Sequence, residues 1–126
     1  MPTPGVYSGD RCMFPVMASP RLQEPSFLIL TALAAGPQHG YGVIKDVEEI
    51  SSGAVTLRVG TLYGALDRLT AEGLVELDHE EVVDSRLRRY YRLTESGSAH
   101  LSAEASRRRQ QAGTALRRLR ASGATS

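Results

Sequence analysis

The feature that most constrains this chain is a change of hydrophobic period at Gly73. Before that glycine, apolar residues recur every three or four positions, the spacing that collects side chains on one face of an α-helix. After it, Val75, Leu77 and His79 alternate with acidic residues, which is the spacing of a β-strand. With 126 residues, the chain is long enough for one domain with a real core. A few helices followed by a small sheet are therefore expected.

Three helices are predicted before the change. The first begins at Pro25, because proline suits a first helical turn, and ends at Gly36-Pro37. The second spans about residues 41–50, and the third runs from about Gly60 to Glu72, where Gly73 stops it. Their apolar faces are predicted to be Phe27, Leu28, Leu30 and Leu33, then Val43, Ile44, Val47 and Ile50, then Leu62, Ala65, Leu66 and Leu69.

Two strands and a last helix are predicted after Gly73. The sequence "VDSR" is typical of a turn between strands, and one face of the second strand is formed by Leu87, Arg89, Tyr91 and Leu93. Thr94 is expected to cap the last helix. This order predicts a mainly α fold with a small β-hairpin, a winged helix-turn-helix DNA-binding domain at residues 21–94. A mobile arm at 1–20, a C-terminal dimerisation helix at 95–120 and a disordered tail at 121–126 complete the predicted organisation.

Composition narrows the class of protein. The net charge is only +1, so an overall positive field is no argument for nucleic acid, although arginines cluster at 86–92, 107–109 and 117–120. One cysteine, Cys12, excludes an internal disulfide and fits a reducing compartment. The run "FLILTALAA" is about half of a membrane span, so a cytoplasmic protein without a membrane partner is expected. Neither a metal-ligand cluster nor a nucleophile with its base is evident, so we predict no enzyme, metal or cofactor.

The start of the third helix carries the functional signal. Gly60, Tyr63, Gly64, Asp67 and Arg68 fall opposite the leucine face, and near the start of the helix this side has almost no side-chain bulk. One interpretation is a solvent face with two accidental glycines. The other is a helix start that must come close to a partner.

Three motifs decide between these interpretations. "GPQHGYGVI" at 36–44, "GTLYGALDRLTAEGLV" at 60–75 and "RRYYRLTESG" at 88–97 together resemble the PadR family of bacterial transcriptional regulators, over about residues 25–101. Gly64 stands where that family commonly has proline, and Gly42 stands where it usually has an acidic residue. The last helix is short, which resembles the subgroup with a single C-terminal helix.

The resemblance and the residue types together predict DNA contacts. The start of the third helix is expected to enter the major groove, and the arginines of the hairpin are expected to form a wing along the minor groove or its phosphates. For His39 a buried, hydrogen-bonded role is an equal alternative, and for the wing the alternative is a solvated charged strand. The predicted DNA-binding residues are His39, Tyr41, Arg58, Gly60, Thr61, Tyr63, Gly64, Arg68, Arg86, Arg88 and Arg89.

The last helix has an apolar stripe that the hairpin alone cannot cover, so a symmetric partner helix is expected. The predicted dimerisation residues are Leu101, Ala105, Ala112, Leu116 and Leu119. An exposed arginine-rich tail is the alternative. These features predict a homodimeric repressor that binds a pseudo-palindromic operator, with a small-molecule effector of unknown identity as a further partner. The competing hypothesis is a non-catalytic winged-helix adaptor that binds protein through its acidic second helix and wing strand.

Overall fold

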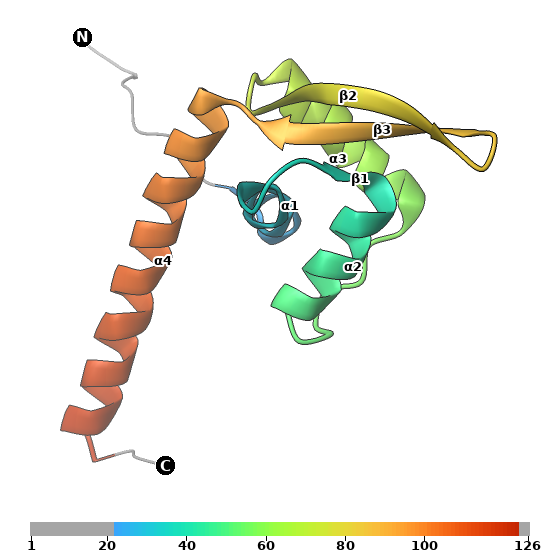
Figure 1. Cartoon of the computed structure of the whole chain (residues 1–126). Coiled ribbons are helices and arrows are strands. Elements are labelled where there is room, and N and C mark those ends of the chain that lie inside the picture. The colour runs from blue at the N-terminus through green and yellow to red at the C-terminus, as the bar shows by residue number, and fades with distance from the viewer. Residues whose placement is uncertain (1–21, 124–126) are drawn as a thin grey trace, which may run out of the picture.

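A computed structural model describes residues 22–123 as four α-helices and a three-stranded antiparallel sheet (Figure 1). The elements in chain order are α1 (Glu24–Ala34), β1 (Gln38–His39), α2 (Gly40–Ile50), α3 (Val59–Ala71), β2 (Val75–Val83), β3 (Arg86–Leu93) and α4 (Glu95–Ala121). The predicted mainly α, winged-helix architecture is confirmed. The predicted arm at 1–20 and the end of the predicted tail lie outside the described residues.

The core is built around α1, which lies between α4 on one side and α2 on the other (Figure 1). Its Ile29, Leu30 and Ala32 are fully buried, although only Leu30 was assigned to the predicted apolar face. A helix covered on several sides is apolar almost all round, because α2, α4 and β3 all pack against it. The predicted phase of α3 is right, since its four face residues are buried and Leu66 is fully so.

One residue of the predicted buried stripes is misplaced. Ile50 is 40% exposed, because it is the last residue of α2 and lies beyond the neighbours that bury Val43 and Val47.

The sheet corrects the prediction of a simple hairpin. Its strand order is β1-β3-β2, and the short β1 pairs with β3 through Gln38 opposite Tyr91 and His39 opposite Tyr90. Two residues are too few to show an alternating pattern, so the sequence contained no periodic signal for this strand. Its effect is to fix the segment that leads into α2 against the base of the wing.

A β-bulge corrects the predicted faces of β2. Leu77 lies opposite Tyr91, but the next paired residue is His79, opposite Tyr90, and Asp78 is the extra residue. The bulge therefore places His79 on the other side of the sheet from Leu77, where its ring stacks on Tyr90 with centroids 4.3 Å apart. Simple alternation had placed Leu77 and His79 on one face.

The last helix starts in close contact with the sheet. The Thr94 hydroxyl accepts a hydrogen bond from the Gly97 backbone N–H at 2.9 Å, which confirms the predicted cap. A Cβ on Gly97 would lie far inside contact distance of the backbone carbonyl oxygen of Leu74. With 27 residues the helix is about 40 Å long, and its second half extends beyond the rest of the domain (Figure 1).

Candidate nucleic-acid interface

The start of α3 is an open helix end. Arg58 is the N-cap residue in an extended conformation, and no side-chain hydrogen bond caps the helix there. Val59 is 51% exposed, and Gly60 and Thr61 are exposed as well. The first amide groups of a helix have no intrahelical acceptor, so they and the helix dipole favour an anion at this end.

Two glycines on this helix have empty space above them. A Cβ built on Gly60 or on Gly64 meets no heavy atom within 4 Å. Glycine in a helix costs about 0.5–1 kcal/mol relative to alanine. Nothing among residues 22–123 requires either glycine, so the fold itself does not explain them.

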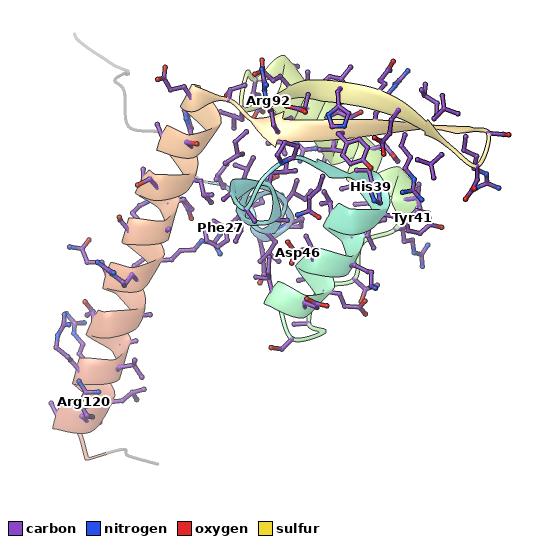
Figure 2. All side chains as sticks on the ribbon, viewed as in Figure 1. Phe27, His39, Tyr41, Asp46, Arg92 and Arg120 are labelled. Atoms are coloured by element: carbon purple, nitrogen blue, oxygen red, sulfur yellow. The ribbon has the colours of Figure 1, made fainter. Side chains whose placement is uncertain are left out.

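Tyr63 connects the start of α3 to the start of α2. Its hydroxyl oxygen lies so close to Gly40 that a Cβ there would be 2.5 Å from it. The hydroxyl has no hydrogen-bond partner within the described part of the chain, and the residue is 39% exposed. Next to Gly40, Tyr41 is 72% exposed and points away from the core (Figure 2). Two tyrosines thus flank the amino-terminal end of α2.

His39 is partly buried and hydrogen-bonded within the protomer, as one of its two predicted roles requires. Its Nδ1 accepts a hydrogen bond from the Gly42 backbone N–H at 3.3 Å and so caps α2, and its ring meets Tyr90 edge-on with centroids 5.3 Å apart. Partial burial is the larger cause that lowers the pKa of His39 below its usual value, and the positive charge of Arg88 lowers it further. The imidazole is therefore held neutral at physiological pH, in the form that can accept the capping bond. This histidine positions the start of α2.

Arg68 does not lie with the other predicted contacts. Its guanidinium donates a hydrogen bond to the Ser26 hydroxyl at 3.2 Å and so faces α1. Arg68 comes two helical turns after Gly60, and there the neighbour of α3 is α1. Arg58, at the other end of the helix, remains beside the exposed glycines.

The wing arginines differ in their surroundings. Arg89 donates a hydrogen bond across the strands to Glu80 at 3.1 Å, which raises the pKa of the guanidinium. Arg86 is exposed next to the hairpin turn and Arg88 is partly buried beside His39. Neither has a hydrogen-bond or ion-pair partner among the described residues. Two of the three predicted wing contacts are therefore available to a ligand.

The base of the wing is held by contacts that the sequence analysis missed. Arg92 bridges Glu76 at 2.8 Å and Asp78 at 3.0 Å, and the Tyr90 hydroxyl donates to Glu81 at 2.8 Å. These pairs are exposed, so each contributes little to stability, but together they hold the strands in register. Opposite charges on the two strands could have predicted these pairs, but the bulge shifts the register, so counting along the sequence does not place the charges opposite each other.

The N-terminal ends of α2 and α3 and the tip of the wing lie on the side of the molecule away from α4 (Figure 1). This side combines two helix starts, two exposed tyrosines and the arginines without partners. Such a surface offers hydrogen-bond donors and partial positive charge to an extended anion.

The predicted dimerisation residues fall into two groups. Leu101 is partly buried and packs against the core of its own protomer. Ala105 and Ala112 are exposed, and Leu116 and Leu119 are 56% and 50% exposed. The helix itself ends at Ala121, one residue beyond the predicted limit.

An ion-pair cluster fastens α4 to α1. Glu104 is only 2% exposed and is paired with Arg107 and with Arg108, the latter at 2.8 Å. These hydrogen bonds, with that of Arg108 the stronger, lower the pKa of Glu104 to about 2. Arg108 also donates to the Leu22 carbonyl at 3.0 Å and lies over the Phe27 ring, 4.1 Å from its centre. Sequence reasoning missed this cluster, because an arginine run is usually a solvated face.

Within residues 22–123, no three or more His, Cys, Asp or Glu side chains form a group that would hold a metal ion. The same part of the chain contains no helix with the length and apolar character that crossing a bilayer requires.

Comparison with known proteins gives the family. The sequence model of the "Transcriptional regulator PadR-like family" matches residues 29–103. The "Transcriptional regulator Rv3488" of Mycobacterium tuberculosis is 42% identical over 57 residues, which are 45% of this chain and 52% of that protein. "Uncharacterized protein X" of Lysinibacillus sphaericus is 28% identical over 75 residues, 60% of this chain and 69% of that protein.

Solved structures show the same fold. A PadR-like transcriptional regulator from Bacillus cereus has a TM-score of 0.63 at 21% identity, covering 75% of this chain and 90% of that one. Bacillus subtilis PadR in complex with operator DNA has a TM-score of 0.58 at 23% identity, covering 64% of this chain and 46% of that one. A winged helix and a family match across residues 29–103 of the 126 lead to one conclusion: this chain belongs to the PadR-like family of transcriptional regulators.

Proposed function

We propose that this protein is a sequence-specific DNA-binding repressor that binds a pseudo-palindromic operator as a homodimer. The observation that carries the proposal is the empty space above Gly60 and Gly64 on α3. A helix that keeps two unfavourable residues with nothing packed on them is suited to a close approach by something outside the protomer. The major groove of DNA accepts a helix in this way, and its base edges must come close to the helix backbone to be read.

Donors around the glycines support the same conclusion. The exposed amides at the start of α3, the Thr61 hydroxyl and the Arg58 guanidinium surround the position that the groove would occupy. Tyr41 and Tyr63 flank the start of α2 and would bind a backbone phosphate there. A family member of the same fold, Bacillus subtilis PadR, has been solved with operator DNA.

The wing is proposed to contact phosphates through Arg86 and Arg88, which have no described partner. Arg89 would instead stiffen the hairpin through its pair with Glu80. Arg68, which is bonded to Ser26, is not proposed as a DNA contact.

Dimerisation is proposed to use the second half of α4. At about 100° per residue, Ala105, Ala112, Leu116 and Leu119 fall within a band about 60° wide, in line with Leu101. Leu101 is covered by the core of its own protomer, whereas the later residues of the band project past the domain (Figure 1). A second copy related by a two-fold axis would cover the band and give two recognition helices. One winged helix covers only a half-site, so the dimer supplies the specificity.

The protein is proposed to act in the cytoplasm, where its operator lies, and to need no catalytic group, metal or cofactor for binding. A small-molecule effector would release it from DNA by favouring a dimer whose recognition helices are spaced wrongly for successive grooves.

A mobility-shift experiment with footprinting tests the proposal. The upstream region of the protein's own gene is the probe, with excess non-specific duplex as competitor. We expect a retarded complex that resists the competitor and protects two half-sites about 10–10.5 base pairs apart, centre to centre. Retardation that the competitor removes entirely would favour the protein-binding adaptor instead.

A further inference from the structure

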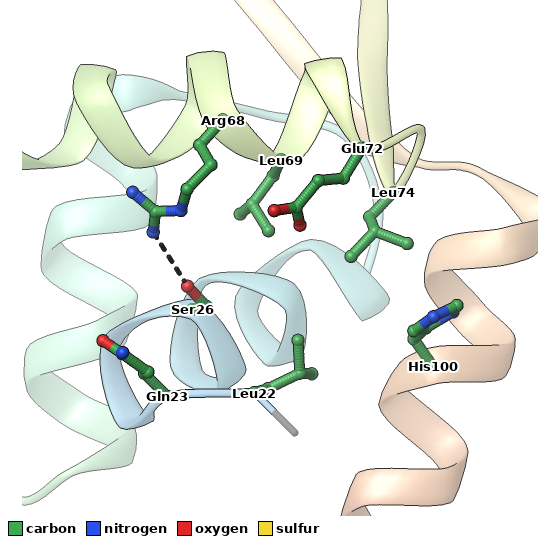
Figure 3. A pocket seen from close by; sticks show the side chains of 8 residues that line it. All are labelled: Leu22, Gln23, Ser26, Arg68, Leu69, Glu72, Leu74 and His100. Atoms are coloured by element: carbon green, nitrogen blue, oxygen red, sulfur yellow. Dashed lines mark hydrogen bonds between the residues drawn. The ribbon is translucent and has the colours of Figure 1, made fainter. Parts of the chain in front are cut away.

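A pocket of about 730 Å³ lies behind the proposed DNA-binding face. It is a half-open pocket bordered by α1, by the second half of α3 and by the start of α4 (Figure 3). The lining residues are Leu22, Gln23, Ser26, Arg68, Leu69, Glu72, Leu74 and His100. The volume is within the range of sites for small organic ligands.

Two opposite charges line this space, Arg68 on α3 and Glu72 at the C-cap of that helix. Arg68 and Glu72 are one helical turn apart, at a spacing where an ion pair commonly forms. They form none here, because Arg68 turns toward Ser26 and the Glu72 carboxylate points into the pocket (Figure 3). Glu72 has no hydrogen-bond or ion-pair partner among the described residues. The pocket thus presents one cation and one anion, with Leu69 between them in the view of Figure 3.

The remaining walls are apolar or neutral. Leu69 and Leu74 are 1% and 3% exposed, and Leu22 is packed against the core. On α4, the His100 Nδ1 bonds the Ser96 carbonyl at 3.0 Å, so Nδ1 carries the hydrogen and Nε2 of the neutral ring is an acceptor. The pocket therefore combines two opposite charges with an apolar wall, of which Leu22 is the more exposed part.

We propose that this pocket binds a zwitterionic ligand of the α-amino-acid class with an apolar side chain. The carboxylate would pair with Arg68, and the ammonium would pair with Glu72, with His100 as a further acceptor. The side chain would lie against the apolar wall, chiefly on the partly buried Leu22. The pairing uses guanidinium–carboxylate and ammonium–carboxylate bonds, which are stronger than neutral hydrogen bonds.

The positions of the charges select this class. A simple anion such as phosphate would suit Arg68 but would be repelled by Glu72, which lines the same pocket. Arg68 and Glu72 are four residues apart, about one helical turn, so a ligand that meets both must carry its two charges close together.

The pocket also offers a route to regulation, and this consequence rests on the proposed DNA binding. Arg68 belongs to the helix that carries Tyr63, and His100 belongs to the helix proposed to form the dimer. A ligand that binds both walls would bias the angle between α3 and α4. By thermodynamic linkage, operator DNA would then change the affinity for the ligand by the same factor as the ligand changes the affinity for DNA.

Calorimetric titration of the full chain without DNA tests the site itself. The probes are L-phenylalanine and L-leucine, with N-acetyl-L-phenylalanine, which lacks the ammonium, and L-phenylalaninamide, which lacks the carboxylate. We expect saturable binding of at least one free amino acid with a dissociation constant on the order of 1 mM or lower. Both blocked analogues should bind at least about tenfold more weakly. No saturable heat with either amino acid at about ten times that concentration would overturn the proposal.

Variants locate the binding. Arg68→Gln and Glu72→Gln should each weaken the amino acid about tenfold or more, whereas Asp67→Asn, on the neighbouring position outside this pocket, should leave it unchanged. Glu72 makes no described contact that folding needs, so Glu72→Gln remains informative if Arg68→Gln lowers stability. Undiminished binding in Glu72→Gln would overturn the assignment. Because no DNA is present, failure of these titrations leaves operator binding as a separate question.

Discussion

Replacing Gly64 with alanine separates the needs of the fold from those of the proposed ligand. Gly64 lies in the body of α3, and its added Cβ meets no atom within 4 Å. The substitution should therefore stabilise the free protein by about 0.5–1 kcal/mol, the usual gain for alanine over glycine in a helix. For a domain of this size the melting temperature should rise by about 2–8 °C.

The same methyl group should weaken operator binding. If the groove approaches the backbone at Gly64, the new Cβ occupies space that DNA atoms would use, as in an overpacked interface. A penalty on the order of 1–3 kcal/mol corresponds to a roughly 5–150-fold loss of affinity. Stability and binding thus move in opposite directions, which unfolding cannot produce.

The assay pairs calorimetric melting with fluorescence anisotropy on a labelled operator duplex. Gly113→Ala is the matched control, because Gly113 is also in a helix and its Cβ would meet only the flexible end of Arg117, at 3.3 Å. The control should be stabilised to a similar degree and should bind DNA like the unmodified protein.

A Gly64→Ala protein that melts higher and binds the operator with undiminished affinity would show that DNA does not approach this turn of α3. The DNA contacts would then have to lie nearer Arg58 and Thr61, or on the wing alone.

Three further predictions concern other parts of the chain. Gly97→Ala should lower the free energy of unfolding by about 1–3 kcal/mol, because its Cβ would collide with the Leu74 carbonyl oxygen. The midpoint of urea unfolding measures this change, and an unchanged midpoint would mean that α4 moves away freely. Leu116→Asp combined with Leu119→Asp should give a folded monomer in sedimentation. Both residues are at least half exposed in the protomer, and a dimer would bury the new carboxylates. A persistent dimer would place the interface elsewhere. Glu104 has a folded-state pKa of about 2 against an ordinary 4.5, so its stabilising contribution is complete above about pH 4.5 and is lost as the pH falls toward 2. Glu104→Gln should flatten that part of an acid-unfolding curve. An identical curve would show that the ion pairs do not stabilise the fold.

Hydrophobic period alone predicted much of the fold. The leucine face of α3 and the two faces of β3 agree with the structure, because each comes from a regular spacing over a complete element. The Thr94 cap was also predictable, since threonine before an acidic first turn is a common helix start.

Features outside regular spacing could not be predicted in this way. The strand β1 has two residues, too few for a pattern, and the bulge at Asp78 reverses an alternation that the sequence shows without interruption. Ile29 was missed because a helix covered on several sides has no single apolar face. Each of these depends on which element packs beside the segment.

In the candidate site too, some features were predictable from regular spacing and others were not. The exposed group at the start of α3 was predictable as a group, because its members share one side of the helix. The partners of single residues were not. His39 is not among the usual N-cap residues, so its bond to the Gly42 amide was hidden, and Arg68 reaches α1 only because α1 lies beside that turn.

The glycines of the helices show the difference between residues that the fold explains and residues that it does not. In the sequence, Gly40, Gly60, Gly64 and Gly97 all look like breaks in helical patterns. In the structure, Gly97 is pressed against the Leu74 carbonyl and Gly40 lies under the Tyr63 hydroxyl, so the fold accounts for both. Gly60 and Gly64 face open space in the first turns of α3. A costly residue with no internal reason is best explained by an external one, and the proposed approach of DNA to the backbone of α3 supplies such a reason for both glycines.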